Sequence, residues 1–168
     1  MADTATERVA LFSIRPQYAT ALMSGEKRVE FRRQPLPDDV VRVVVYATAP
    51  VQRVIGSFEV DGVEALAPES AWAKYGEVGG IEENAFFRYY EGTGSAYVIR
   101  AGQATRAVTP FALSEISQSM RPPQSFMYLR DEALGRAHRL LGEQKAPSRT
   151  LPVIGWVRDR LVGAVAVG

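Results

Sequence analysis

The sequence contains no cysteine and a single histidine among its 168 residues. The absence of cysteine excludes disulfide bonds, thiolate nucleophiles and cysteine metal sites, and it fits a reducing compartment such as the cytoplasm. The one histidine, His138, stands among arginines in a segment patterned as a surface helix. A histidine metal site or a Ser-His catalytic pair therefore lacks its parts, and we expect neither a metal nor a cofactor.

Long apolar runs and phosphate-binding glycine motifs are also missing. No run approaches the ~20 apolar residues that a membrane-spanning helix needs, and the first residues lack the pattern of a signal peptide. No glycine-rich phosphate loop or dinucleotide-binding glycine pattern follows a predicted strand, so that kind of nucleotide site is not expected. We therefore expect a cytoplasmic protein without membrane contact.

The charges are nearly balanced overall but unevenly distributed. The net charge is +1, while residues 1–53 hold 8 basic and 6 acidic residues, residues 54–95 hold 2 and 8, and residues 96–168 hold 10 and 5. Of the 20 basic residues, 17 are arginine. Segregated charge favours one basic face, and arginine binds phosphate through two parallel hydrogen bonds. Codon usage in a GC-rich genome would explain the same arginine content.

Hydrophobic periodicity and turn residues predict one α+β domain. We expect short helices over residues 16–24, 68–76, 81–92 and 131–145, a proline-fixed loop over 121–129, and strands over 9–14, 27–33, 40–50, 53–66, 95–101 and 105–113. Gly56 predicts a bulge in its strand. Strands this short and bent argue against a doubly wound parallel sheet and favour a small mixed β-barrel decorated with helices.

The segment "SGEKRVEFRR" (24–33) carries the most chemistry in the chain. Lys27, Glu30 and Arg32 alternate with the apolar Val29 and Phe31. A lysine desolvated in a cleft has a lowered pKa and can act as a base or nucleophile beside a carboxylate. The plainer interpretation is a solvated strand edge whose opposite charges neutralise each other. Strict alternation would also separate Lys27 from Glu30, unless the turn after Gly25 breaks it.

The wider segment "SIRPQYATALMSGEKRVEFRR" (13–33) resembles the signature of the ASCH family, a branch of the PUA-like β-barrels. The resemblance rests on a strand ending in Ser-Ile-Arg-Pro, a short helix, and the pattern G-x-K-x-x-E-x-R at Gly25, Lys27, Glu30 and Arg32. The segments 45–60, 96–101 and 122–129 extend the resemblance over residues 9–130. It implies a domain over 1–130, with a C-terminal helix and tail over 131–168 packed on the same domain.

The resemblance also implies a function. ASCH proteins have a cleft beside the first helix and are associated with binding RNA and other nucleic acids. The subgroup that this chain resembles is described as predicted transcriptional regulators. We therefore expect the chain to bind nucleic acid, RNA rather than DNA, or a modified base or nucleoside.

Two enzymatic alternatives come from the same resemblance. Some members hydrolyse N4-acetylcytidine with the lysine of this motif, which would be Lys27, and others are ribonucleases. The amidohydrolase members have threonine where this chain has Glu30, and their acidic partner comes from a later helical region, where Glu77 is the nearest candidate. If the protein is an enzyme, we expect a hydrolase with Lys27 and Glu30 as its catalytic pair. A regulatory module that binds an unknown protein partner through residues 131–168 is the third alternative.

The barrel interpretation assigns further residues to the cleft. Basic side chains would hold phosphate, and aromatic side chains would stack on unpaired bases, because RNA is mostly read in single-stranded segments. For Tyr46 and Tyr97 the alternative is burial in the core. The predicted ligand-binding residues are Ser13, Arg15, Lys27, Glu30, Arg32, Tyr46, Trp72, Tyr97, Gln124 and Ser125.

Overall fold

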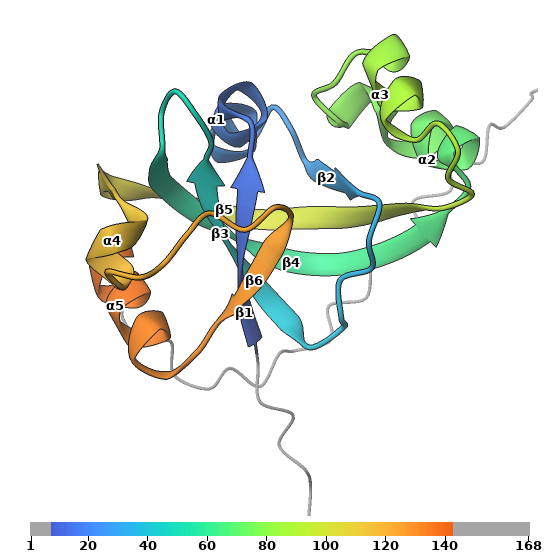
Figure 1. Ribbon diagram of the computed structural model, residues 1–168. Coiled ribbons are helices and arrows are strands. Elements are labelled where there is room, and N and C mark those ends of the chain that lie inside the picture. Colours follow the sequence, from blue (N-terminus) through green and yellow to red (C-terminus); the bar gives the residue numbers. More distant parts are fainter. Residues whose placement is uncertain (1–7, 143–168) are drawn as a thin grey trace, which may run out of the picture.

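Residues 8–142 are the part of the chain that the computed structural model describes. Their elements follow one another from the N-terminal to the C-terminal end as a strand, a helix, three strands, a helical segment, a long strand, and a final helix–strand–helix unit (Figure 1). In order they are β1 (Arg8–Ile14), α1 (Pro16–Ser24), β2 (Val29–Arg32), β3 (Val40–Ala47), β4 (Arg53–Leu66), α2 (Pro68–Tyr75), the 3-10 turn η1 (Gly76–Val78), α3 (Glu83–Tyr89), β5 (Ala96–Phe111), α4 (Leu113–Ile116), β6 (Phe126–Leu129) and α5 (Asp131–Leu141).

One mixed sheet carries these residues, with the strand order β2-β5-β4-β3-β1-β6. β1 and β3 are parallel, and the other four neighbouring pairs are antiparallel. The predicted α+β fold with a mixed, mostly antiparallel sheet is therefore confirmed. The sheet does not close within the described chain, because β2 and β6 are its two edges. The word barrel thus applies only loosely.

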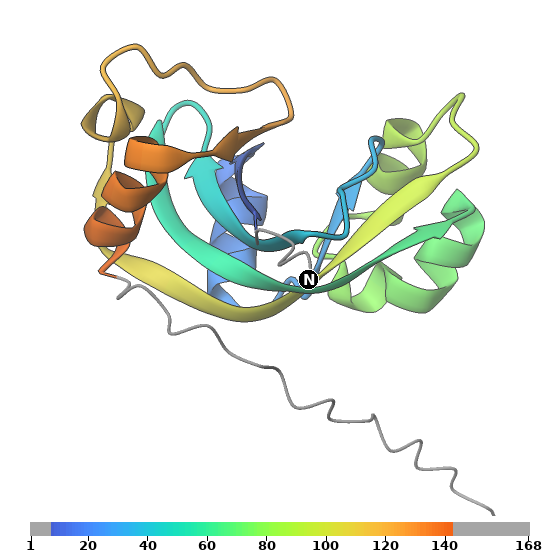
Figure 2. The same cartoon turned by 90° about the horizontal axis from the view of Figure 1, so that it is seen from below.

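Side chains link the two edges where backbone pairing does not. Arg32 of β2 donates to the Ser125 hydroxyl, just before β6, at 3.5 Å, and to the Ser13 carbonyl near the end of β1 at 3.3 Å. The long strands β4 and β5 bend between the two ends of the molecule (Figure 2). Polar side chains therefore fill the seam at which a closed barrel would have hydrogen-bonded strands.

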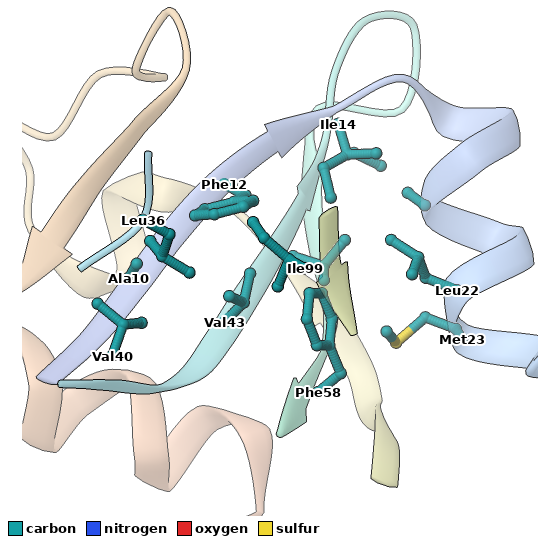
Figure 3. Close-up of a cluster of buried hydrophobic side chains, with 13 residues drawn as sticks. Ala10, Phe12, Ile14, Leu22, Met23, Leu36, Val40, Val43, Phe58 and Ile99 are labelled. Carbon is teal, nitrogen blue, oxygen red and sulfur yellow. The ribbon is translucent and has the colours of Figure 1, made fainter. Parts of the chain in front are cut away.

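Helices cover the sheet in three places, and each covers an apolar cluster. The cluster drawn in Figure 3 joins α1, through Leu22 and Met23, to one face of β1, β3 and β4, including Phe12 and Phe58. α4 and α5 cover the opposite face of the same strands at one end of the sheet. α2 and α3 cover β2 and β5 at the other end. Burial of apolar surface at ~25 cal/mol per Å² makes these clusters the main stabilising contribution.

Several predicted boundaries were wrong, and tertiary pairing explains them. The strands predicted over 95–101 and 105–113 form the single strand β5, because β4 pairs with it from Leu66↔Ala96 to Val54↔Phe111. Gly102 and Gln103 lie within β5 at a register shift, between the pairs Val60↔Ala101 and Phe58↔Ala104. The predicted loop over 121–129 contains β6, which pairs with β1. The bulge predicted at Gly56 is confirmed, because the pairing of β4 with β3 and its pairing with β5 both shift register between Val54 and Gly56.

The C-terminal helix packs on the sheet rather than standing apart from it. α5 buries Ala137 and Leu141 in the same cluster as Phe111 and Leu129. It ends at Leu141 and not at residue 145, because Gly142 adopts a left-handed conformation with φ 74°. Glycine adopts this conformation without steric cost. Residues 143–168 of the predicted tail lie outside the described residues.

Candidate functional site

A cavity of about 410 Å³ opens at the seam between the two edges of the sheet. Five of the sequence-predicted residues line it together, namely Ser13, Arg15, Lys27, Glu30 and Arg32. They come from the end of β1, the start of α1, the turn before β2 and β2 itself. The G-x-K-x-x-E-x-R segment therefore forms one wall of a cavity and not a solvated strand edge.

The turn after α1 explains how Lys27 and Glu30 reach the same cavity. Gly25 has φ 83°, which ends the helix and reverses the chain. The Lys27 amide then donates to the Ala21 carbonyl at 3.0 Å, and the Arg28 amide donates to the Val78 carbonyl at 2.8 Å. Strand alternation begins only at Val29. Lys27 precedes the strand, so the alternation of side chains does not place it on the other face from Glu30.

Three charged side chains form a buried cluster at the base of the cavity. Lys27, Glu30 and Arg32 are 3%, 7% and 8% exposed. One Glu30 oxygen lies 3.5 Å from Lys27 Nζ, and the other lies 3.1 Å from Arg32 Nε. Lys27 Nζ also donates to the Gly79 carbonyl at 2.5 Å. One carboxylate thus balances two buried cations, which leaves the cluster with one excess positive charge.

Burial lowers the pKa of the Lys27 ammonium, since desolvation penalises the charged form. The Glu30 carboxylate opposes this pKa shift, and the Arg32 guanidinium adds to it. A lysine in this position releases its proton more readily than an exposed one. The arrangement can therefore supply a neutral amine as a base, or an ammonium as a donor, depending on pH.

Arg32 contacts several groups, but one of its buried N–H donors has no hydrogen-bond partner within the described part of the chain. Its guanidinium carbon lies 4.4 Å from the centre of the Phe12 ring, a cation–π distance. Its Nε is close enough to Glu30 for an ion pair, yet it is counted with Ser13 Oγ among the buried side-chain atoms of residues 8–142 that lack a hydrogen-bond partner. The two charges therefore attract each other, but the N–H of Arg32 Nε does not point along the contact. Buried polar atoms of this kind are rare and suit a polar ligand.

Aromatic and apolar residues form the rest of the wall. Lys27 Nζ lies 5.5 Å from the Tyr18 ring centre and 5.2 Å from that of Phe31. Tyr89 lies at the mouth, 38% exposed, with its ring edge-on to Tyr90 at 4.8 Å. Desolvation raises the pKa of Tyr89 above its usual value, so its hydroxyl stays protonated at neutral pH. The cavity thus combines planar apolar surfaces with charged groups.

The other sequence-predicted residues lie at or outside the edge of the cavity. Ser125 reaches it through its contact with Arg32, and Gln124 beside it is exposed. Tyr46 is 5% exposed in the cluster under α4 and α5. Trp72 packs on Phe86, with ring centres 5.1 Å apart. Tyr97 is opposite Arg32 in the β2–β5 pairing but does not line the cavity.

Sequence reasoning missed the residues that α3 and the loop before it contribute. Besides Tyr18 and Phe31, the cavity is lined by Ile14, Ile81, Ala85, Arg88 and Tyr89. In the aromatic run at 86–90, Phe86 and Tyr90 are buried. The helical periodicity that buries those two residues turns Tyr89 and Arg88 outward. This helical periodicity is the sequence signal that could have identified Arg88 and Tyr89 as cavity residues.

A second cavity, of about 530 Å³, adjoins the first. Tyr18, Ile81 and Ala85 line both cavities and form the wall that they share. The second cavity has an acidic lining, with Glu77 and Glu82 beside Gln17. Glu77, the candidate acidic partner of Lys27, therefore belongs to the neighbouring cavity. Among residues 8–142, no group of histidine, aspartate and glutamate side chains is arranged to hold a metal ion.

Comparison with known proteins places this architecture in a family. The model of the ASCH domain matches residues 12–102, which include the whole G-x-K-x-x-E-x-R segment. The chain belongs to the ASCH domain family. A Zymomonas mobilis protein named ASCH domain-containing ribonuclease is 36% identical over 135 residues, which are 79% of this chain and 91% of the relative.

Solved structures agree with this assignment. The crystal structure of ASCH from Zymomonas mobilis matches with a TM-score of 0.75 at 33% identity, over 80% of this ASCH chain and 96% of that one. Variants of the same protein, one with a serine replaced by alanine and one with a tyrosine replaced by phenylalanine, match with TM-scores of 0.74 and 0.73. A large ribosomal subunit protein uL22 from Ureaplasma parvum is 32% identical over 126 residues, which are 74% of this chain and 40% of that protein.

No helix within residues 8–142 combines the length and apolar character that crossing a membrane requires.

Proposed function

We propose that this ASCH protein binds RNA, or a modified base or nucleoside, in the cavity formed around Lys27, Glu30 and Arg32. The observation that carries the proposal is the composition of the cavity. Its lining contains the four cations Arg15, Lys27, Arg32 and Arg88 against the single carboxylate of Glu30. Excess positive charge attracts phosphate, and Arg binds phosphate with defined geometry.

The aromatic part of the lining supports a nucleic acid over a simple anion. Tyr18, Phe31 and Tyr89 offer planar surfaces to the cavity. Stacking of a base on such a ring contributes about 1–3 kcal/mol and does not depend on sequence. Double-stranded RNA keeps its bases stacked inside the helix, so a cavity of this kind suits an unpaired segment. The Zymomonas relative's name supports RNA over DNA.

Ribonuclease activity is the second candidate, and two observations favour it. A relative that aligns over most of both chains is named a ribonuclease, and the pKa of Lys27 is lowered beside Glu30. In such a reaction the neutral Lys27 amine would accept the proton of a ribose 2′-hydroxyl. The 2′-oxygen would then attack the adjacent phosphorus, and the bond between phosphorus and the 5′-oxygen would break. The products would be a 2′,3′-cyclic phosphate and a 5′-hydroxyl that takes its proton from water. Arg32 would offset the charge that develops on the phosphoryl oxygens.

The remaining alternatives stay predictions. Hydrolysis of N4-acylated cytidine needs an acidic partner for Lys27, and here Glu30 occupies the position at which such enzymes have threonine. Transcriptional regulation and binding of a protein partner would involve other surfaces. A cytoplasmic location likewise stays an expectation.

Binding and cleavage can be tested with one set of proteins. Fluorescence anisotropy with a labelled single-stranded RNA should give an affinity that falls as salt rises, because phosphate contacts release counterions. Lys27→Met should weaken binding at least tenfold, whereas Lys74→Met should not. Lys74 is the other lysine of residues 8–142, is 55% exposed and lies outside the cavity. Lack of RNA binding at low salt, or equal effects of the two substitutions, would refute the proposal.

Cleavage is followed by incubating the end-labelled RNA with the same proteins and separating the products. N4-acetylcytidine is included as a second substrate. RNA products that require Lys27 would support the ribonuclease candidate, and release of acetate would support the amidohydrolase. If both substrates remain intact at high protein concentration, the protein is a binding module.

A further inference from the structure

Two arginines at the cavity mouth have no role in the buried cluster. Arg15 and Arg88 line the cavity, are exposed, and make no ion pair or hydrogen bond through their side chains within residues 8–142. They come from two different elements, Arg15 from directly before α1 and Arg88 from α3. Exposed arginines are usually free to move, but these two flank a single cavity. Together they can hold one anionic group at its entrance.

The start of α1 adds to the positive potential at this entrance. α1 begins at Pro16, directly after Arg15, with no acidic residue in its first turn and no side-chain cap. The amide groups of an uncapped first turn carry a partial positive charge. Two arginines and this helix terminus thus reinforce one another at the mouth. A phosphate bound there would lie outside the aromatic walls, while a base could enter between them.

The neighbouring cavity has the opposite charge. Beyond the wall shared by Tyr18, Ile81 and Ala85, the exposed carboxylates of Glu77 and Glu82 line the second cavity, and neither has a side-chain partner within residues 8–142. A nucleic-acid strand that continued past this wall would bring its next phosphate towards these carboxylates. Like charges that approach in this way disfavour binding.

We infer that the cavity holds one nucleotide, with its phosphate on Arg15 and Arg88, and that Glu77 and Glu82 prevent the strand from continuing into the second cavity. The inference rests on the proposed function and specifies the part of the ligand that is recognised. The volume of about 410 Å³ is of the size that one nucleotide needs. The acidic neighbour acts as a specificity determinant, because it selects against a second phosphate.

Three probes test this inference by isothermal titration calorimetry. They are uridine, uridine 5′-monophosphate and a uridine hexanucleotide. The wild-type protein should bind the monophosphate at least tenfold more tightly than the nucleoside. It should bind the hexanucleotide within about tenfold of the monophosphate, since several registers alone add a statistical gain of about sixfold. A single bound phosphate also predicts a shallow salt dependence, with a slope of about −0.7.

Variants separate the two parts of the inference. Arg88→Gln should reduce the preference for monophosphate over nucleoside about tenfold, whereas Arg139→Gln, on α5 and outside the cavity, should not. Glu77→Gln combined with Glu82→Gln should strengthen hexanucleotide binding about three- to tenfold and leave monophosphate binding unchanged. Circular dichroism shows whether each variant is folded.

The contrary outcomes are distinct. Hexanucleotide binding that requires Lys27, together with equal affinity for nucleoside and monophosphate, would overturn this inference and leave the proposed function standing. A hexanucleotide affinity unaffected by the Glu77 and Glu82 substitutions would overturn the role of the acidic neighbour. Failure of all three probes and of longer RNA to bind would overturn both the inference and the proposed function.

Discussion

Replacing Glu30 with glutamine tests the buried charge cluster most severely. The Glu30 side chain is 9% exposed and lies within 3.5 Å of Lys27 Nζ and 3.1 Å of Arg32 Nε. Glutamine keeps the size of the side chain but removes the negative charge, so two buried cations lose their counterion. Removing one partner of a buried ion pair costs about 3–5 kcal/mol. We expect Glu30→Gln to lower the free energy of unfolding by this amount, a large share of the ~5–15 kcal/mol of a typical domain.

Urea denaturation followed by circular dichroism measures this loss of stability, and two further variants serve as comparisons for it. Glu132→Gln removes a carboxylate that also pairs with a cation, Arg136, but whose side chain is 76% exposed. It should cost no more than about 0.5 kcal/mol. Combining Glu30→Gln with Lys27→Met should recover part of the stability, because one unpaired cation is gone. A loss below about 1 kcal/mol for Glu30→Gln alone would refute the buried cluster.

Three other predictions concern stability. Because the pKa of Lys27 is lowered in the folded protein, the unfolded chain binds more protons than the folded one at alkaline pH, and stability should rise as pH increases from that lowered pKa towards 10.5. Urea midpoints between pH 7 and 10 should show this rise in the wild type. The same rise in a Lys27→Met protein would contradict the prediction. Gly79→Ala would place a Cβ 2.4 Å from the Phe31 ring and should lower the free energy of unfolding, measured with urea, by about 1–3 kcal/mol. Gly94→Ala, which has open space around it, should lower it little. Equal losses for the two variants would argue against the contact with Phe31. Leu141→Ala shortens a side chain of α5 that is 2% exposed and should cost about 2–5 kcal/mol. A thermal midpoint unchanged from the wild type would show that α5 is not part of the folded unit.

The local signals of the sequence were sufficient where one element determines its own structure. Pro16 and Gly25 mark the two ends of α1, because proline fits a first helical turn and glycine adopts the left-handed conformation that ends one. The β-branched run before Ala47 forms the buried strand β3. Local signals also locate the charged motif in the chain, but they do not determine which way its side chains point. Its orientation depends on the Val78 and Gly79 carbonyls, about 50 residues away.

The other wall of the cavity could not be predicted, because it depends on tertiary packing. Arg88 and Tyr89 reach the cavity only because α3 is fixed on β2 through Phe86, whose ring lies 4.8 Å from that of Phe31. A pattern of aromatic residues predicts burial, but it does not identify the residue left at the edge. Tyr46 shows the opposite case. As an aromatic residue near the motif it was a plausible stacking partner, yet it lies within the core.

We propose that RNA binds in the cavity between β2, α1 and α3. Titrating ¹⁵N-labelled protein with a short single-stranded RNA and following its backbone amide signals tests this claim most directly. We predict that the largest shifts cluster at residues 13–18, 27–32 and 81–89, and that Lys27→Met abolishes them. Shifts centred on α5 and on residues 101–111 of β5, which do not pair with β2, would contradict the account if the cavity residues were unchanged.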